Sequence, residues 1–129
     1  MYVTFKVDWD GESQKVIRLD YPAGYEWEEF FTAMERTGEL ASSVEHGVYI
    51  ILNMLQLEKP PGGLLMNFPK IARLRPDNEL AAIVVGADGF LEQMGQIFSR
   101  VYGHFHFVKT VDGAYAHITK LQESEGKKG

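Results

Sequence analysis

The sequence predicts an α/β domain with a mixed, mostly parallel sheet of about five strands flanked by helices. Two observations support this fold class. The runs VYIILNML (residues 48–55) and LAAIVV (80–85) are almost continuously apolar, which is typical of central strands covered on both faces. Strand-like and helix-like segments also alternate in the order β-β-α-β-α-β-α-β-α, and such alternation implies parallel strands joined by right-handed crossovers.

The N-terminal segment predicts an antiparallel hairpin. Apolar and polar residues alternate through residues 2–9 and again through KVIRLDY (15–21), so each strand has one face toward the core. Asp10 and Gly11 stand between the two strands and favour the positive φ angles of a tight turn. The hairpin therefore supplies the antiparallel strand of the mixed sheet.

Four later segments repeat apolar residues at the helical spacing of about 3.6 residues. The first covers residues 25–44 and begins with three glutamates, which suit the positive end of the helix dipole. The second covers residues 64–72. The third begins at the N-cap Asp88, and the fourth begins at Thr110. Between the third and the fourth, HFHFV (104–108) alternates as a strand does.

Composition and charge narrow the possible functions. The 129 residues are 45% hydrophobic, which predicts one compact domain, residues 1–122, followed by a flexible tail, residues 123–129. The net charge is −5 and no basic stripe is present, which argues against nucleic-acid binding. The absence of cysteine excludes disulfides, thiolate metal sites and cysteine nucleophiles.

The sequence leads us to expect neither a secretory leader nor a membrane span. The N-terminus MYVTFKVDWD alternates apolar and polar residues instead of placing a basic region before an apolar one. No apolar run approaches the ~20 residues that cross a bilayer. A soluble, cytoplasmic protein is therefore expected.

Three stretches carry a resemblance to a known family: VYIILNMLQLEKPPGGLL (48–65), IVVGADGFLEQMGQIFSRVY (83–102) and FHFVKTVDGAYAHI (105–118). With the order of elements, they resemble the STAS domain (sulfate transporter and anti-sigma factor antagonist), in particular its SpoIIAA-like branch. The similarity covers nearly the whole chain. It implies the STAS fold and a regulatory role exercised through partner proteins.

The resemblance also implies positions for the family's switch. In phospho-switched STAS domains the third strand ends in a turn with an aspartate, and an Asp-Ser-Ser-Gly motif, phosphorylated on its second serine, starts the second helix. The strand position falls here at Asn53, and the motif falls near Pro61, Gly62, Gly63 and Leu64. Because residues 54–67 contain no Ser, Thr or Tyr, the chain resembles a divergent member that lacks the phosphorylatable serine.

Two loops are candidate binding sites. The turn Pro60–Gly63 precedes the second helix, where free backbone N–H groups favour anions. It lacks the Gly-Lys-Ser/Thr ending of a phosphate loop and its prolines remove donors, so a plain strand-to-helix turn is the other interpretation. The loop with Gly86 and Asp88 leaves the carboxyl end of a central strand, where open α/β sheets place ligands. Asp88 either meets a ligand or partner there or only caps the next helix.

Histidines are the sole metal candidates. His104 and His106 lie two apart on a predicted strand and so share a face, although a third ligand would have to come from His46 or His117 without recognisable spacing. The other interpretation is a pair of surface histidines. No nucleophile motif is present. We therefore assign no catalytic residue and no cofactor, and do not expect an enzyme.

These observations lead to three hypotheses. Leu64, Leu65 and Met66 cannot all face inward on one helix, so at least one is expected to be exposed. The first hypothesis is a non-enzymatic interaction or regulatory module of STAS-like fold, which contacts a protein or a second copy of itself through Pro60–Gly63, Leu65 and Met66. The alternative is a binder or carrier of a small apolar or anionic ligand, held between the second helix and the sheet. The second alternative is a small metal-dependent enzyme built on the histidine pair.

Overall fold

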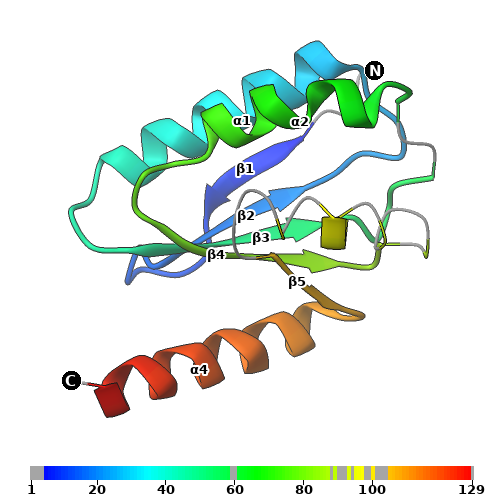
Figure 1. Cartoon of the computed structure of the whole chain (residues 1–129). Coiled ribbons are helices and arrows are strands. Elements are labelled where there is room, and N and C mark those ends of the chain that lie inside the picture. Colours follow the sequence, from blue (N-terminus) through cyan, green and yellow to red (C-terminus); the bar gives the residue numbers. More distant parts are fainter. Residues whose placement is uncertain are drawn as a thin grey trace.

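The computed structural model describes residues 5–58, 61–87, 89, 93, 95–97, 100 and 105–128, without the side chains of residues 64, 65 and 125–128. Its strands form one five-stranded sheet in the order β1-β2-β3-β4-β5 (Figure 1). The strands are β1 (Lys6–Trp9), β2 (Val16–Asp20), β3 (Val48–Asn53), β4 (Glu79–Val85) and β5 (Phe105–Val108). The helices are α1 (Trp27–Ser42), α2 (Leu64–Leu74) and α4 (Val111–Lys128).

The sheet is mixed, as the sequence predicts. β1 pairs antiparallel with β2, with Val7 opposite Leu19, and every later pair is parallel. Gly11 in the hairpin turn has a φ of 105°, the left-handed conformation expected there. Residues 1–4, where the predicted first strand begins, lie outside the described residues.

Each parallel strand lies next to the one before it, so the chain moves across the sheet in one direction from β2 to β5. Right-handed crossovers in one direction place the connecting helices on one face. Accordingly α1 and α2 lie together above the sheet in Figure 1, and α4, which follows the last strand, lies against the opposite face. The prediction that helices cover both faces of the central strands is confirmed.

The sheet has a separate apolar core on each face, because side chains alternate along a strand. On the α1 side the core includes Ile17, Leu19 and Ile50. On the α4 side it includes Ile51 and Ile83, and Ala114 and Ile118 of α4 pack against them. The near-continuous apolar runs of β3 and β4 are explained by these two cores.

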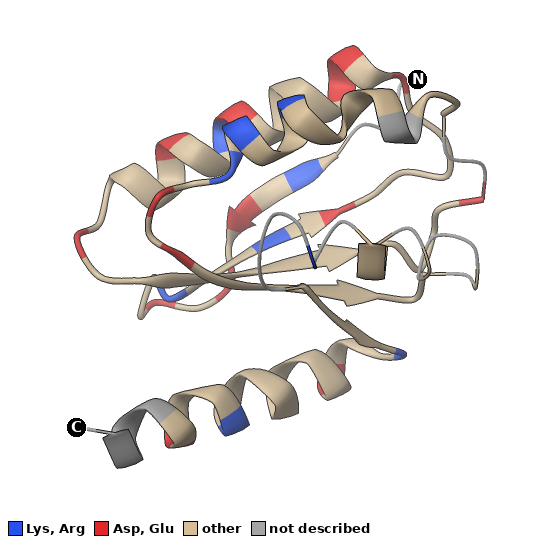
Figure 2. Ribbon diagram, in the orientation of Figure 1, with Lys and Arg blue, Asp and Glu red and all other residues tan. Residues whose placement is uncertain are grey.

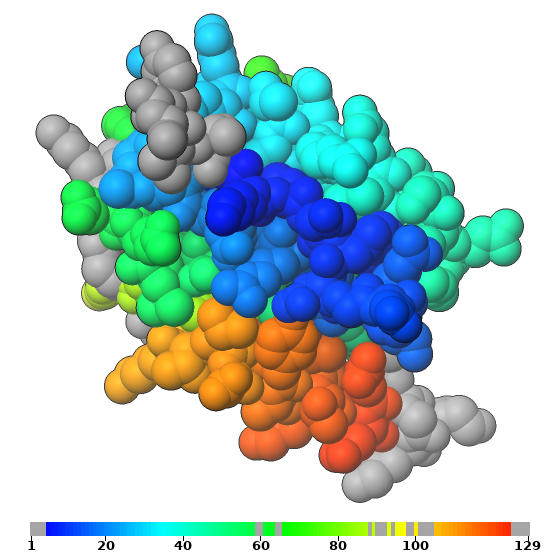
Figure 3. All heavy atoms as spheres, turned by 180° about the vertical axis from the view of Figure 1, so that it is seen from behind, coloured from blue at the N-terminus to red at the C-terminus, as the bar shows by residue number. Residues whose placement is uncertain are grey.

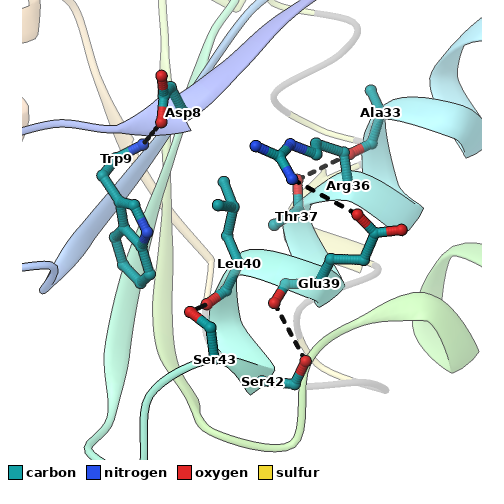
Figure 4. Close-up of polar contacts among 9 residues, drawn as sticks. All are labelled: Asp8, Trp9, Ala33, Arg36, Thr37, Glu39, Leu40, Ser42 and Ser43. Atoms are coloured by element: carbon teal, nitrogen blue, oxygen red, sulfur yellow. Dashed lines mark hydrogen bonds and ion pairs between the residues drawn. The ribbon is translucent and has the colours of Figure 1, made fainter.

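Helix α1 has satisfied ends and a buried hydroxyl. At its start the backbone N–H of Glu26 donates to Oε1 of Glu29 (3.1 Å), so the acidic first turn predicted from the sequence also caps the helix. Figure 4 shows polar contacts in the later turns of the helix, where the hydroxyl of the fully buried Thr37 donates to the carbonyl oxygen of Ala33 (2.9 Å). The hydroxyl of Ser43 donates to the carbonyl of Leu40 (2.6 Å) and closes the C-terminal end.

The surface carries charges of both signs. Figure 2 shows acidic and basic residues side by side on α1, whereas β3 carries none. Seen from behind, the residues of β1 form the surface between α1 and α4, so β1 is an edge strand whose outer side is not covered by another described strand (Figure 3).

The C-terminal end of α4 differs from the predicted boundary, and the predicted third helix is described only in part. Helix α4 runs through residues 123–128, for which the sequence predicts a flexible tail. Of the predicted third helix, residues 89, 93, 95–97 and 100 are helical. Within the described residues, no helix has both the length and the apolar character needed to cross a bilayer.

Candidate functional site

A cavity of about 100 Å³ opens at the carboxyl end of the sheet, on the side of α1 and α2. Its walls come from the carboxyl ends of β2, β3 and β4 and the residues that follow them, from β5, from α1 and α2, and from Gly95. The lining residues are almost all apolar or aromatic: Tyr21, Tyr25, Trp27, Phe30, Leu52, Met54, Leu57, Pro61, Phe68, Ile71, Val84, Ala87, Gly95, Phe105 and Phe107. None of these side chains carries a charge.

The topology explains why these residues meet. Tyr21 directly follows β2, Met54 follows β3, and Ala87 lies two residues beyond β4. Parallel strands end at one edge of the sheet, so the residues after them gather there. The two crossover helices start above the same edge and bring Trp27 and Phe68 over it.

The wall from α1 and the loop before it is a cluster of aromatic rings. The centroids of Tyr21 and Tyr25 are 5.6 Å apart, those of Tyr25 and Trp27 are 6.2 Å apart, and those of Trp27 and Phe30 are 5.6 Å apart, all close to edge-to-face. These separations lie in the favourable range for aromatic pairs. Phe31, outside the lining, stacks on Trp27 at 5.8 Å.

Burial changes the acidity of both tyrosines in the cavity. Loss of hydration raises the pKa of Tyr25 to about 12. Burial, and to a lesser extent the neighbouring Tyr25, raises the pKa of Tyr21 well above the usual value. Both shifts mean that the cavity disfavours negative charge, because a phenolate there would lose its water without gaining a cation.

The glycine turn before α2 forms part of the cavity wall. Pro61 lines the cavity, and the indole Nε1–H of Trp27 donates to the carbonyl oxygen of Gly62 (2.7 Å). Gly63 has a φ of 80°, which an L side chain adopts only with strain, and its carbonyl accepts a hydrogen bond from Nδ2 of Asn67 (2.9 Å). The turn is therefore fixed at the site, joined to α1 on one side and to α2 on the other.

Of the three adjacent apolar residues after the turn, the structure describes the side chain of Met66. Met66 is 86% exposed on the outer face of α2, so at least one of the three adjacent apolar residues faces solvent. The side chain of Leu65 and the whole of Pro60 lie outside the described residues. The prediction that they form part of a contact surface stays a prediction.

Asn53 belongs to the opposite face of the sheet. Its Nδ2 donates to Oδ1 of Asp20 (2.8 Å), and its Oδ1 accepts from the backbone N–H of Leu55 (3.2 Å). Asp20 also pairs with Arg18, Nε to Oδ1, at 2.8 Å. Asn53 is thus held in a polar network on β2 and β3, and it does not line the cavity.

The second candidate loop is represented by Gly86. It has a φ of 79°, and a Cβ added there would come within 2.7 Å of Cδ2 of Leu55. A packing requirement therefore accounts for this glycine, and it lies beside the cavity rather than in its lining. Asp88 lies outside the described residues.

Two histidines, His106 and His117, meet on the α4 side, away from the cavity, whereas His46 contacts the carbonyl oxygen of Gln14 through Nε2 (2.7 Å). The rings of His106 on β5 and His117 on α4 have centroids 4.4 Å apart, and Nε2 of His117 is buried without a hydrogen-bond partner. His104 lies outside the described residues. In the part of the chain that the structure describes, no three side chains of the metal-binding types come together.

Sequence reasoning found only part of this site. It named Pro61 as a candidate and placed the alternative ligand between the second helix and the sheet, but it did not name Tyr21, Tyr25 or Trp27. The signal that points to them is positional. Aromatic residues stand immediately after β2 and at the start of α1, and both places belong to the carboxyl edge of the sheet.

Comparison with known proteins leaves the family open. No family model, curated protein or solved structure matches the chain. The function is therefore argued from the cavity and its surroundings.

Proposed function

We propose that this protein is a binding module of STAS-like fold that holds a small, mainly apolar molecule in the cavity between α1, α2 and the carboxyl edge of the sheet. The observation that carries the proposal is an open cavity whose walls are almost wholly apolar. Small-molecule sites are typically concave, mostly apolar and largely preformed. The alternation of strands and helices is what supports a relation to STAS domains.

The expected affinity is modest. Small ligands gain between about 0.3 and 1.5 kcal/mol of binding free energy per non-hydrogen atom. Toluene has seven such atoms, and at about 0.7 kcal/mol each the total is about 5 kcal/mol. That value corresponds to a dissociation constant of about 0.2 mM.

Tryptophan fluorescence provides the test, because Trp27 lines the cavity and Trp9 does not. The Trp9→Phe variant leaves Trp27 as the single tryptophan of the chain. We expect toluene to change its emission with saturation in the range of about 0.1 to 1 mM. An emission that does not change with toluene, or that changes without reaching saturation, would contradict the proposal.

Two further variants locate the bound molecule. Ala87→Leu adds three carbon atoms to a lining residue and should weaken toluene binding at least fivefold, since it takes up part of the cavity. Asn53→Ala removes a polar side chain on the other face and should leave binding unchanged. Equal effects of the two substitutions would place the toluene elsewhere. Far-UV circular dichroism checks that both variants fold.

A second candidate function is contact with a protein or with a second copy of the chain. Exposure of Met66 at 86%, on the helix that follows the turn at Gly62 and Gly63, favours it. Sedimentation of the wild type and of Met66→Glu over a range of concentrations tests self-association. The matched control is Ile97→Glu, at a different apolar residue that is 51% exposed. Association that survives Met66→Glu, or that Ile97→Glu weakens equally, would remove this candidate.

A further inference from the structure

The cavity size limits the ligand to about one ring. An engineered cavity of about 150 Å³ in another protein binds benzene. The cavity here measures about 100 Å³. It is open on one side, so one ring fits with an edge in the opening. A long acyl chain or a fused ring system would extend beyond the opening.

The walls favour an aromatic ring over an aliphatic one. Trp27 forms edge-to-face pairs with Tyr25 and with Phe30, while Tyr25 and Phe30 form a tilted pair, and the ring centroids of all three pairs are about 6 Å apart. Phe105 and Phe107 reach the cavity from β5. A further ring continues this arrangement, and each aromatic pair contributes beyond the burial of its area.

Two residues of this apolar wall, Tyr21 and Tyr25, carry hydroxyl groups. Tyr21 is only 3% exposed, and Tyr25 packs beside it. Among the described residues, the fully buried side-chain atoms without a hydrogen-bond partner are the hydroxyl oxygen of Tyr115 and Nε2 of His117, so the hydroxyls of Tyr21 and Tyr25 do not belong to that group. As groups of lining residues, these two hydroxyls can donate a hydrogen bond to a polar group in the cavity or accept one from it.

The described surroundings disfavour a charged ligand. Arg75 lies over the ring of Phe105, 4.9 Å from its centroid, but it is paired with the carboxylate of Glu79. Lys70 lies over Phe31, which is not a lining residue. The raised pKa values of Tyr21 and Tyr25 agree with this, because they report the same penalty on negative charge.

We infer that the cavity takes a neutral molecule with one aromatic ring and one hydrogen-bonding group, of which phenol is the simplest, and that the hydroxyls of Tyr21 and Tyr25 hold that group. This inference rests on the proposed function and narrows it. The sequence leads us to expect a small ligand that is either apolar or anionic. The ligand inferred here is neither purely apolar nor charged. The ring supplies the apolar contact, and the polar group is uncharged.

The test compares phenol, toluene and benzoate, with Trp27 as reporter in the Trp9→Phe background. The hydroxyls are removed in Tyr21→Phe, in Tyr25→Phe and in the double variant, which keep the rings. We expect the double variant to weaken phenol about fivefold, the value of one hydrogen bond, and to change toluene less than twofold. Benzoate should bind at least tenfold more weakly than phenol, because it carries a charge into an uncharged cavity.

The outcomes separate this inference from the function on which it rests. If toluene and phenol both bind and the tyrosine variants weaken them equally or not at all, the inference is wrong and the binding function stands. If benzoate binds as tightly as phenol, the ligand class is wrong. If none of the three compounds binds, the proposed function itself fails. Should Tyr21→Phe not fold, Tyr25→Phe alone gives the same comparison at the less buried ring.

Discussion

The hydrogen bond from Trp27 to Gly62 joins residues 35 apart in sequence, and its removal gives a quantitative test of the site. Trp27→Phe removes the indole donor but keeps a ring that can pack on Phe31 and Phe30. A neutral hydrogen bond contributes a net ~0.5–1.5 kcal/mol to stability, and the lower half applies here because the exposed carbonyl of Gly62 can bind water instead.

Loss of the larger ring adds a packing cost. Removing about 40 Å² of apolar contact costs about 1 kcal/mol at ~25 cal/mol per Å². The free energy of unfolding should therefore fall by about 1.5–2 kcal/mol. For a domain of this size that fall corresponds to a decrease in Tm of roughly 6–8 °C.

Urea denaturation followed by far-UV circular dichroism measures the change, with the m-value expected to stay constant. The matched control is Trp9→Phe. Trp9 makes its hydrogen bond through the backbone N–H, to Oδ1 of Asp8 at 2.7 Å, and the substitution preserves that bond (Figure 4). If Trp27→Phe costs no more than Trp9→Phe, the turn is not held by Trp27 and its role as a fixed wall is wrong.

The remaining predictions concern the turn glycines, the tyrosines and the opposite face. Gly86→Ala should destabilise the fold by about 2 kcal/mol or more, because it combines a left-handed φ with a close contact to Leu55. Gly11→Ala has the same kind of φ but open space around it, so it should cost only about 1 kcal/mol. Urea midpoints that rank the two variants in the reverse order would be inconsistent with the packing at Gly86. The free energy of unfolding should fall as pH rises from about 10 to about 12, because the unfolded chain releases the proton of Tyr25 at the ordinary pKa and the folded chain holds it until about pH 12. Tyr25→Phe should reduce that fall by about 2 kcal/mol. An unchanged pH dependence in the variant would disprove the effect of burial on the pKa of Tyr25. Asn53→Ala should cost about 1 kcal/mol of stability, and a null effect on the urea midpoint would show that its two hydrogen bonds are replaced by water.

The sheet and its direction could be predicted from the sequence because the signals are local. The alternation of residues 2–9 and 15–21 and the apolar runs of β3 and β4 each depend on neighbours in the chain. The same patterns also imply right-handed crossovers, and the one-directional strand order follows once each strand pairs with the next. The end of α4 was harder to predict, because polar residues such as Glu123 and Lys127 suit a solvated tail as well as an exposed helix.

The cavity was harder to predict because it depends on distances between segments far apart in sequence. The local sequence pattern predicts Tyr21 to be the last residue of a strand and Trp27 to be the first core residue of a helix. Neither pattern indicates that the two side chains border a cavity. The glycine turn was found, but its interpretation depends on the contact between Trp27 and Gly62. Sequence patterns indicate which residues are buried and not where packing is incomplete.

The most direct test of the binding function is to locate a bound ring by NMR in the wild-type protein. Methyl groups of Leu57, Ile71 and Val84 line the cavity, and those of Val16 and Ile118 belong to the core on the α4 side, so they form an internal control. On addition of toluene to about 1 mM, the cavity methyl resonances should shift with saturation, with intermolecular nuclear Overhauser effects to the ring. The control methyls should not move. An absence of shifts at the cavity, or shifts of equal size in both cores, would contradict the account.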